Sequence, residues 1–366
     1  MTVDAVGGVW DYAIELALGL APAGVEVMFA CMGPRPNQAQ RRHALKLGNL
    51  SLAESAFRLE WMEDFRKDAS SGGKWLLELE RVWMPDLIQI NGYCHAALRW
   101  RAPTVLVAHS CVASWWKAVR GTGLPPAWNQ YSQAVKRGLR SANAVIAPSG
   151  AMLANLREEY GWEGGGIVIH NGRTRRSSDR MAKQEYILTV GRLWDEAKNI
   201  AALDEIAARL AWPVYAAGDI SSPGGGIVAP IHIRTLGRLD SEELELWYAN
   251  AAIYALPARY EPFGLSILEA ALSGCALVLG DIPSLRELWD GAARFVAPAD
   301  ARQLGKAITS LIELPGTRRL LAEQARMRAS RLTRERMADG YLEAYSGVLC
   351  GTKPRHEAPR ALSPAD

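Results

Sequence analysis

Short apolar runs alternate with longer stretches of helical pattern between residues 185 and 298. Each run ends in or near Gly, Pro or Asp, and about 10 to 20 residues of mostly helical periodicity separate one run from the next. This alternation predicts βαβ units around a parallel sheet, with ligands at the carboxyl ends of the strands. Six strands are expected, at 186–191, 213–219, 231–237, 252–258, 276–281 and 293–298.

The first half of the chain has a less regular version of the same pattern and predicts a second α/β domain. Its expected strands are 25–33, 87–93, 104–110, 144–149 and 167–172. A polar, basic segment, RTRRSSDRMAKQ (173–184), separates the halves, so we predict an N-terminal domain over 1–175 and a C-terminal domain over 176–333. Helices are expected over 302–330 and 334–349, and residues 351–366 are expected to be a disordered tail.

The start of the chain departs from this alternation of strands and helices. The pair Gly7-Gly8, where a first strand would turn into a helix, follows only six residues. We therefore expect a short first strand, or a chain that begins a few residues late, and either would weaken the first domain.

The run EPFGLSILEA, residues 261–270, places two glutamates on either side of an expected helix start. Glu261 precedes a proline and should be extended, at the end of the strand before it. Free N–H groups of Gly264, Leu265 and Ser266 would form a site for an anion such as a diphosphate. Glu269 lies about 7 Å further along the helix. The two carboxylates suit the hydroxyl groups of a nucleotide sugar, although an ordinary helix start with one loop and one surface glutamate has the same spacing.

This run resembles the E-x(7)-E signature of retaining family 4 glycosyltransferases. The resemblance implies the GT-B fold, in which two Rossmann-like domains face each other across a cleft and a last helix, here 334–350, returns to the first domain. It extends over nearly the whole chain and is strongest from 186 to 300. It also implies that Glu261 orients the transferred sugar and that Glu269 holds the ribose.

The run VGRLWDEAKN, residues 190–199, puts Arg192 and Lys198 just past an expected strand. Two cations there can neutralise a diphosphate leaving group. A surface Arg and Lys beside a helix start is the alternative, and the match to the family's G-R-x(5)-K pattern favours the catalytic interpretation. No D-x-D triplet is present, and these cations supply the field that Mg²⁺ gives elsewhere, so we expect neither a metal nor a separate cofactor.

Two features of the first domain extend the resemblance. Gly7-Gly8 is similar to the family's glycine turn, whose backbone approaches the phosphates. His109 ends the strand TVLVAHS, and in the family a histidine after this strand contacts the transferred sugar. A structural histidine is the alternative for His109, and His95 is a weaker candidate for the same role.

The sequence indicates the binding site for the base of the donor less clearly than the site for its diphosphate. Leu239 and Glu243 lie where family members recognise the base, mostly through backbone groups near Arg238 and Leu239, so they do not identify the nucleotide. Asn171-Gly172 resembles the family's domain-linking turn.

Composition narrows the class of protein. The 366 residues, 49% of them hydrophobic, are enough for two domain cores, and a net charge of +3 argues against a nucleic-acid partner. Five cysteines without metal-site spacing indicate reduced thiols in a cytoplasmic protein. With no leader pattern and no apolar run of about 18 residues, neither export nor membrane spanning is expected.

A basic segment of the first domain predicts the kind of acceptor. Residues 87–157 contain no Asp or Glu. We expect this face to receive an anionic acceptor, or to lie peripherally on the inner face of an anionic membrane that carries a lipid-linked acceptor. The alternative is that acidic residues from 54–68 pack beside the segment and cancel its field, which would leave a neutral glycan or small molecule as the acceptor. The segment's charged and Trp residues are Arg99, Trp100, Arg101, Trp115, Trp116, Lys117, Arg120, Trp128, Lys136, Arg137, Arg140 and Arg157.

Together these features predict a hexosyltransferase that moves a sugar from a nucleoside diphosphate donor with retention of configuration, in the synthesis of a cell-surface glycan or glycolipid. A GT-B epimerase or phosphorylase and a non-catalytic nucleotide-sugar-binding scaffold are the alternatives. An NAD oxidoreductase is least favoured because no strand is followed by GxGxxG.

Overall fold

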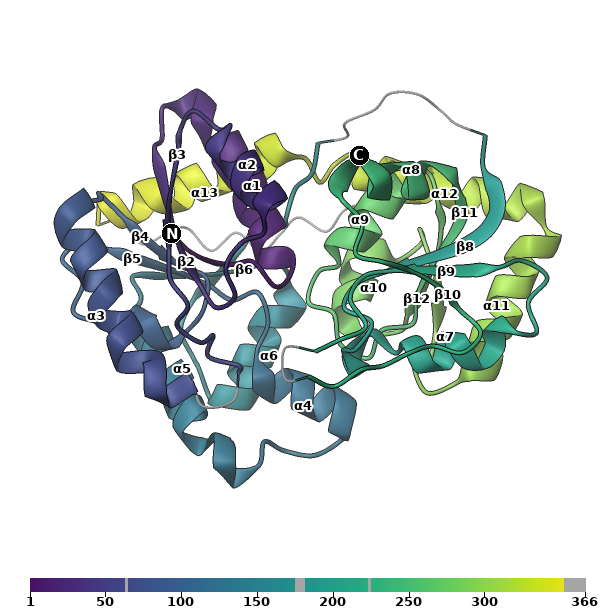
Figure 1. Cartoon of the computed structure of the whole chain (residues 1–366), viewed down its shortest axis with the longest axis horizontal. Helices are drawn as coiled ribbons and strands as arrows, with labels where there is room; N and C mark the ends of the chain where they lie inside the picture. The colour runs from purple at the N-terminus through teal and green to yellow at the C-terminus, as the bar shows by residue number, and fades with distance from the viewer. Residues whose placement is uncertain (63–64, 175–181, 223–224, 352–366) are drawn as a thin grey trace. The chain divides into compact units, whose positions relative to one another are not determined.

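The six apolar runs of the second half form one parallel sheet in the computed structural model, which describes residues 1–62, 65–174, 182–222 and 225–351 (Figure 1). The strand order is β10-β9-β8-β11-β12-β13, so the sheet grows in opposite directions from the neighbouring strands β8 and β11. The strands are β8 (Gln184–Val190), β9 (Val214–Ala217), β10 (Arg234–Gly237), β11 (Ala251–Leu256), β12 (Ala276–Gly280) and β13 (Arg294–Val296).

Helices cover both faces of this sheet, which explains why its central strands are continuous apolar runs. All six residues of β11 are buried, and successive side chains point to opposite faces. Tyr254 packs in a core with Leu268 of α9, whereas Ile253 packs in a second core with Leu203 of α7. The helices are α7 (Ile200–Ala207), α8 (Ser241–Asn250), α9 (Leu265–Leu272), α10 (Pro283–Trp289), α11 (Ala301–Glu313) and α12 (Pro315–Ala329).

The segment 302–330, expected to be helical, is two helices that meet at Leu314 and Pro315. Proline has no N–H group to continue the hydrogen-bond ladder of α11, but it is well suited to the first position of α12. The chain therefore turns at this point and starts a new helix.

The first half contains two parallel sheets. One has the order β1-β2-β3 and the other β4-β5-β6-β7. The five expected strands are present, and the prediction of a short first strand is confirmed, since β1 has three residues. The pattern missed β3, whose sequence LSLAE is only partly buried. The strands are β1 (Thr2–Asp4), β2 (Val27–Met32), β3 (Leu50–Glu54), β4 (Ile88–Ile90), β5 (Thr104–Val107), β6 (Ala144–Ala147) and β7 (Gly166–Val168).

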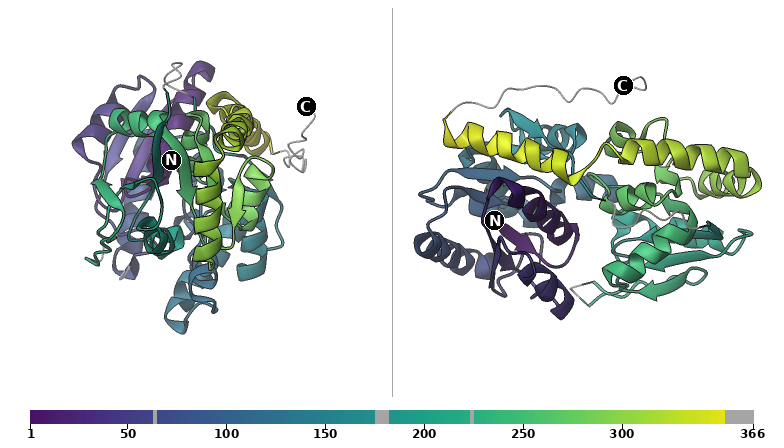
Figure 2. Two further views of the ribbon diagram at one scale, coloured as in Figure 1. Left: turned by 90° about the vertical axis from the view of Figure 1, so that its right-hand side faces the viewer. Right: turned by 90° about the horizontal axis from the view of Figure 1, so that it is seen from above.

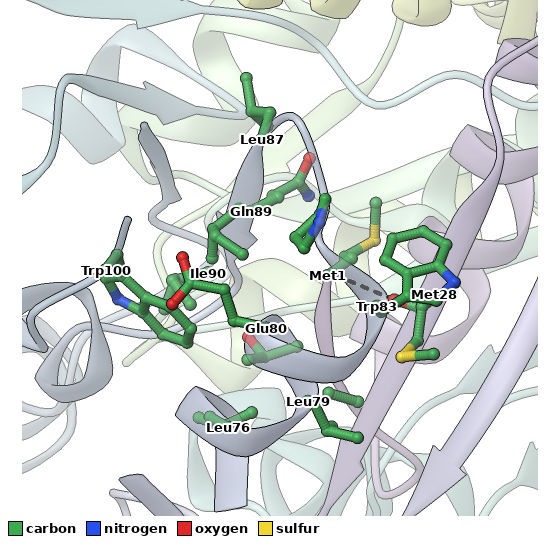
Figure 3. Close-up of a pocket in the computed structure, with 14 residues that line it drawn as sticks. Met1, Met28, Leu76, Leu79, Glu80, Trp83, Leu87, Gln89, Ile90 and Trp100 are labelled. Carbon is green, nitrogen blue, oxygen red and sulfur yellow. Dashed lines mark hydrogen bonds between the residues drawn. The ribbon is translucent and has the colours of Figure 1, made fainter. Parts of the chain in front are cut away.

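Asn91, immediately after β4, joins the two sheets where β1 and β4 approach each other. Its backbone N–H donates to the hydroxyl oxygen of Thr2 at 2.9 Å, and its side-chain Nδ2 donates to the Thr2 carbonyl oxygen at 2.7 Å. A small pocket, with a volume of about 40 Å³, lies beside this junction and is lined by residues of both sheets, including Met28 and Ile88, and by the helix α3 (Phe65–Trp83) (Figure 3). These two hydrogen bonds of Asn91 thus take the place of part of the backbone hydrogen bonding that would otherwise join β1 to β4.

The last helix, α13 (Arg334–Leu349), packs against α1 of the first half (Figures 1 and 2), which confirms that the chain returns to its first domain. Nε of Arg334 donates to the buried carboxylate of Glu15 at 2.6 Å. The other helices of this half are α1 (Gly8–Leu20), α2 (Gln38–Leu45), α3 (Phe65–Trp83), α4 (Val112–Arg120), α5 (Asn129–Ser141) and α6 (Gly150–Tyr160).

The chain thus divides into two units, and together with the parallel sheets this confirms the predicted α/β class with two Rossmann-like domains. Unit 1 comprises 1–116, 122–172 and the chain from Arg334 onward, and unit 2 comprises 117–121 and 173–333. The expected tail, 351–366, lies almost entirely outside the described residues, as does most of the expected linker.

Candidate functional site

The candidate site of unit 2 lies at the carboxyl ends of β8 and β11. Arg192 follows β8 and Glu261 follows β11, and these strands are hydrogen-bonded neighbours in the sheet. Because the strand order reverses between them, the connections after β8 and β11 leave opposite faces of the sheet. A crevice at such a switch point is where open α/β sheets bind ligands.

Lys198 and Glu261, 63 residues apart in sequence, form a direct ion pair at this point. Nζ of Lys198 donates to Oε2 of Glu261, and the two side chains are only 15% and 12% exposed. The backbone around Glu261 is also fixed, since the hydroxyl group of Ser284 donates to its carbonyl oxygen at 2.5 Å. The structure therefore brings together two residues that the sequence had linked only through separate motifs.

The turn that carries Lys198 is held by Asn199, a residue that the sequence analysis did not single out. Asn199 has a left-handed backbone with φ 57° and is buried. Its Nδ2 donates to the carbonyl oxygens of Pro257 and Pro298 at 2.9 and 2.8 Å. These bonds tie the end of the short helix η4 (Glu196–Lys198) to the segments after β11 and β13, and so fix the position of Lys198.

Arg192 is held by the buried carboxylate of Asp195. Its Nη2 donates to Oδ2 of Asp195 at 2.6 Å, and its guanidinium lies over the ring of Trp194. Asp195 also accepts from the backbone N–H of Ala197 at 3.0 Å, which starts the turn that leads to Lys198. The Arg192 side chain is 38% exposed, so it is oriented by these contacts and still accessible to an anion.

Helix α9 begins as expected, directly after Gly264. Gly264 has φ 89°, and a side chain there would meet the side chain of Ile267, so the position requires glycine. No described residue accepts a hydrogen bond from the backbone N–H of Gly264, Leu265 or Ser266, which leaves them available to an anion. The Ser266 hydroxyl accepts from the Tyr254 hydroxyl at 2.8 Å, which attaches the first turn of the helix to β11.

Glu269, one turn further along α9, is paired with Arg173. Nη2 of Arg173 lies 2.5 Å from Oε1 of Glu269, and the backbone N–H of Arg173 donates to the carbonyl oxygen of Leu332 at 3.0 Å. In the sequence this arginine begins the polar, basic segment 173–184, and no local pattern connects it with the helix. The contact holds one oxygen of the Glu269 carboxylate.

Leu239 and Glu243 lie at the start of α8. The Glu243 side chain accepts from the backbone N–H of Asp240 at 3.1 Å, and Asp240 accepts from the backbone N–H of Glu243 at 2.9 Å, so both acidic groups cap the helix. The side chain of Glu243 thus has a local structural role. Leu239 follows the carboxyl end of β10, on the same sheet edge as Arg192.

The other predicted residues belong to unit 1. Gly7 and Gly8 form the turn between β1 and α1, where Oδ1 of Asp4 accepts from the backbone N–H groups of Val6 and Gly7 at 3.1 and 3.3 Å. The predicted glycine turn is therefore present, and the backbone of its first residue is held by a carboxylate.

His109 lies just after β5, with its ring packed edge-on against Tyr12 at 4.4 Å between centroids. Its Nε2 is 3.1 Å from Oδ1 of Asn91. Burial lowers the pKa of His109 to about 3, so the ring is neutral at physiological pH. His95 lies in the short helix η2 (Cys94–Ala97), where Nε2 is 3.4 Å from the carbonyl oxygen of Ala69 and burial also lowers its pKa.

The basic segment keeps most of its cations exposed. Of the acidic residues proposed to cancel its field, Glu54 pairs with Arg41 at 2.6 Å and Asp68 with Arg58 at 3.3 Å, both outside the segment. Glu60 accepts from the backbone N–H groups of Tyr93 and Cys94. Arg120, in contrast, pairs with Glu196 at 2.6 Å within the residues grouped as unit 2.

No cluster of three His, Cys, Asp or Glu side chains in 1–62, 65–174, 182–222 and 225–351 is arranged to hold a metal ion. Within the same residues, every helix is too short or too polar to cross a membrane.

Each half of the chain matches a known protein family. The sequence profile of Glycosyltransferase Family 4 matches residues 6–174, and that of Glycosyl transferases group 1 matches residues 184–314. A glycogen synthase of Mycobacterium tuberculosis is 38% identical over 97 residues, 26% of this chain and 23% of the relative. The chain therefore spans about a quarter of the length of the first curated relatives that it matches.

Two solved structures have the same fold over almost the whole chain. A sucrose-phosphate synthase from Thermosynechococcus elongatus covers 96% of this chain and 99% of its own, with a TM-score of 0.76 at 18% identity. Anabaena Alr3699/HepE in complex with UDP-glucose covers 94% and 99%, with a TM-score of 0.73 at 17% identity. These likenesses extend to the fold of both units.

Proposed function

Since the chain belongs to glycosyltransferase family 4, we propose that it transfers a sugar from a nucleoside diphosphate donor to the hydroxyl group of an acceptor. The observation that carries the proposal is the ion pair between Lys198 and Glu261 at the switch point of unit 2. The exposed guanidinium of Arg192 and the free N–H groups at the start of α9 belong to the same sheet edge. They supply a positive field for a diphosphate beside a carboxylate for sugar hydroxyls.

In the proposed reaction, the bond between the anomeric carbon and the diphosphate oxygen breaks, and the acceptor oxygen bonds to that carbon. Arg192, Lys198 and the α9 amides stabilise the charge on the leaving diphosphate. Glu261 orients the sugar and Glu269 holds the ribose. The leaving diphosphate takes the acceptor proton on the face it departs from, so the anomeric configuration is retained and no protein nucleophile is needed.

We propose a UDP-hexose as the donor, because the related fold of HepE is solved with UDP-glucose. Binding of the base would use backbone groups near Leu239, since the Glu243 carboxylate is committed to the α8 cap. No metal or other cofactor is required, because the cations of the site can neutralise the diphosphate.

For the acceptor, we propose an anionic or lipid-linked glycan at the inner face of a membrane, in a cell-surface glycan or glycolipid pathway. Support comes from α5, where Arg137 and Arg140 are exposed, and from the cationic segment around it, whose neighbouring carboxylates Glu54 and Asp68 are engaged elsewhere. A cytoplasmic protein that binds peripherally would fit this arrangement.

The test is a product assay with a panel of nucleotide sugars and glycan acceptors, read by release of the nucleoside diphosphate and by mass of the product. We expect a glycosylated acceptor, whose formation Glu261→Gln should reduce by about tenfold or more, while Glu205→Gln, at the exposed end of α7, should leave it unchanged. Nucleotide binding without any transfer would instead support a non-catalytic scaffold.

A further inference from the structure

Helices α8 and α9 of unit 2 pack together, and a buried tyrosine of α8 lies between them and the sheet (Figure 1). Tyr248 is 2% exposed, and its ring lies 6.1 Å from the ring of Tyr254. The hydroxyl group of Tyr254 donates to that of Ser266, in the first turn of α9, at 2.8 Å. The carbonyl oxygen of Tyr248 accepts from the thiol of Cys275, just past the other end of α9, at 3.3 Å. Contacts at both ends of α9 therefore hold Tyr248 alongside the helix that carries Glu269.

The hydroxyl group of Tyr248 has no hydrogen bond to any residue that the structure describes. It touches the Glu269 carboxylate without reaching hydrogen-bond geometry, and burial and this negative charge raise the pKa of Tyr248. The hydroxyl group therefore keeps a proton to donate. A buried donor without an acceptor costs free energy, so native structures rarely contain one. Enzymes without their ligand often hold such pairs poorly aligned, and the bond forms when the ligand binds.

The Glu269 carboxylate can accept several hydrogen bonds at once. Arg173 lies 2.5 Å from its Oε1. A carboxylate has about four acceptor sites on its two oxygens, so it can keep Arg173, accept from Tyr248 and also accept from the hydroxyl groups of a ribose. Each fixed donor beside the carboxylate restricts its orientation and so lowers the entropy cost of ordering it when a nucleotide binds.

We propose that Tyr248 is a positioning residue for the nucleotide, whose hydroxyl group donates to Glu269 in the bound protein and fixes the carboxylate to accept from the ribose. This role rests on the proposed function, which assigns Glu269 to the ribose. It makes the selection of a ribose over a deoxyribose depend on a hydroxyl group of α8 that acts through Glu269. Tyr248→Phe should therefore weaken the binding of a ribonucleotide more than that of its deoxy forms, which offer fewer hydroxyl groups to the carboxylate.

A purely structural role for Tyr248 makes a different prediction. Tyr248→Phe keeps the buried ring and removes only the hydroxyl group. If this group only supported the core, its loss would lower the unfolding temperature of the free protein and leave the preference for a ribose unchanged. Because none of the described residues bonds to it in the free protein, we expect an unfolding temperature equal to or above that of the wild type.

Tyr186 provides the matched control. It is buried in the same core as Tyr248, and its hydroxyl group donates to the carbonyl oxygen of Trp247, also on α8, at 2.7 Å. Tyr186→Phe therefore removes a tyrosine hydroxyl that is bonded in the free protein. It should lower the unfolding temperature and leave the preference for a ribose as in the wild type.

The test is a calorimetric titration of the wild type and both variants with UDP, ADP and GDP. The 2′-deoxy and 3′-deoxy forms of the nucleotide that the wild type binds most tightly are then compared with it. The wild type and Tyr186→Phe should prefer the ribonucleotide over at least one deoxy form by about tenfold or more, and Tyr248→Phe should lose most of this preference.

Two results would overturn the role of Tyr248 alone. One is a preference that is absent from the wild type or equal in all three proteins. The other is a free Tyr248→Phe protein that unfolds at as low a temperature as Tyr186→Phe. If none of the three nucleotides binds to the wild type, the proposed function itself fails, and the role of Tyr248 fails with it.

Discussion

Lys198 donates a hydrogen bond to Glu261 across the point where the strand order of unit 2 reverses. The cation proposed to stabilise the leaving diphosphate and the carboxylate proposed to orient the sugar are therefore one hydrogen-bonded unit. Such an arrangement offsets the cost of enclosing either charge alone, because each neutralises the other before a ligand binds.

The two signature glutamates should differ in their kinetic effect. Glu261→Ala should chiefly lower kcat, because this side chain is proposed to orient the reacting sugar, whereas Glu269→Ala should chiefly raise the KM for the donor. Each change removes a hydrogen bond to a charged group, worth about 1.5 to 3 kcal/mol, or roughly tenfold to a hundredfold. Steady-state kinetics measure both, and wild-type values in both variants would rule out the site.

Arg173 should influence donor binding through Glu269. Arg173→Gln removes the 2.5 Å ion pair, so the Glu269 carboxylate is held less firmly and the donor KM should rise about tenfold. Arg173→Lys retains the positive charge but lacks the planar guanidinium group with its paired N–H donors. It should therefore recover only part of the lost donor affinity. If Arg173→Gln changes the unfolding temperature but not KM, the contact is structural only.

Because His109 is buried in its neutral form, the free energy of unfolding should depend on pH. Its folded pKa of about 3 lies below the ordinary 6.5, so between these values the unfolded chain binds a proton that the folded chain does not. The free energy of unfolding therefore has its full value above pH 6.5 as far as His109 is concerned. It decreases as the pH falls toward 3, by up to about 1.4 kcal/mol per pH unit. Urea unfolding at pH 7 and pH 5 should show a smaller loss for His109→Gln than for wild type. Equal losses would contradict the depressed pKa.

Activity should survive a strong chelator, and the product should keep the anomeric configuration of the donor. Both follow from the proposed mechanism, in which Arg192, Lys198 and the α9 amides neutralise the diphosphate and the leaving group guides the acceptor. Proton NMR of fresh product reads the anomer. An inverted product would exclude the proposed mechanism, and loss of activity with the chelator would exclude a metal-free site.

The basic segment should bind anionic surfaces. Charge reversal at Arg137 and Arg140 of α5 should weaken binding to anionic vesicles more than about fivefold for each residue, since the loss of one cation near such a surface costs about 1 kcal/mol and the surface also repels the added carboxylate. Arg120 is a poor choice for this test because it is paired with Glu196. Co-sedimentation with Arg209→Glu as the control, in low and high salt, measures the effect, and equal pelleting with neutral vesicles would refute it.

The sequence predicted the sheet of unit 2 well because its central strands are buried on both faces and are therefore continuous apolar runs. It missed β3 because that strand, at the edge of its sheet, is only partly buried and reads LSLAE. It also read α11 and α12 as one helix, although Pro315 marks the break.

Within the site, local motifs identified Lys198 and Glu261 but not the residues that position them. Asn199, which holds the turn that carries Lys198, acts through carbonyl oxygens 58 and 99 residues away. No local pattern encodes such contacts, because they exist only when the strands have paired. Arg173 was missed for the same reason, since its partner Glu269 is distant in sequence.

The most direct test of the central claim is a calorimetric titration with UDP. We expect saturable binding to the wild type that weakens by about tenfold or more in Arg192→Gln, because the guanidinium at the carboxyl end of β8 is proposed to contact the diphosphate. Arg209→Gln, past the opposite end of α7, is the matched control and should bind like the wild type. Equal affinity in all three proteins would contradict the assignment of this sheet edge as the diphosphate site.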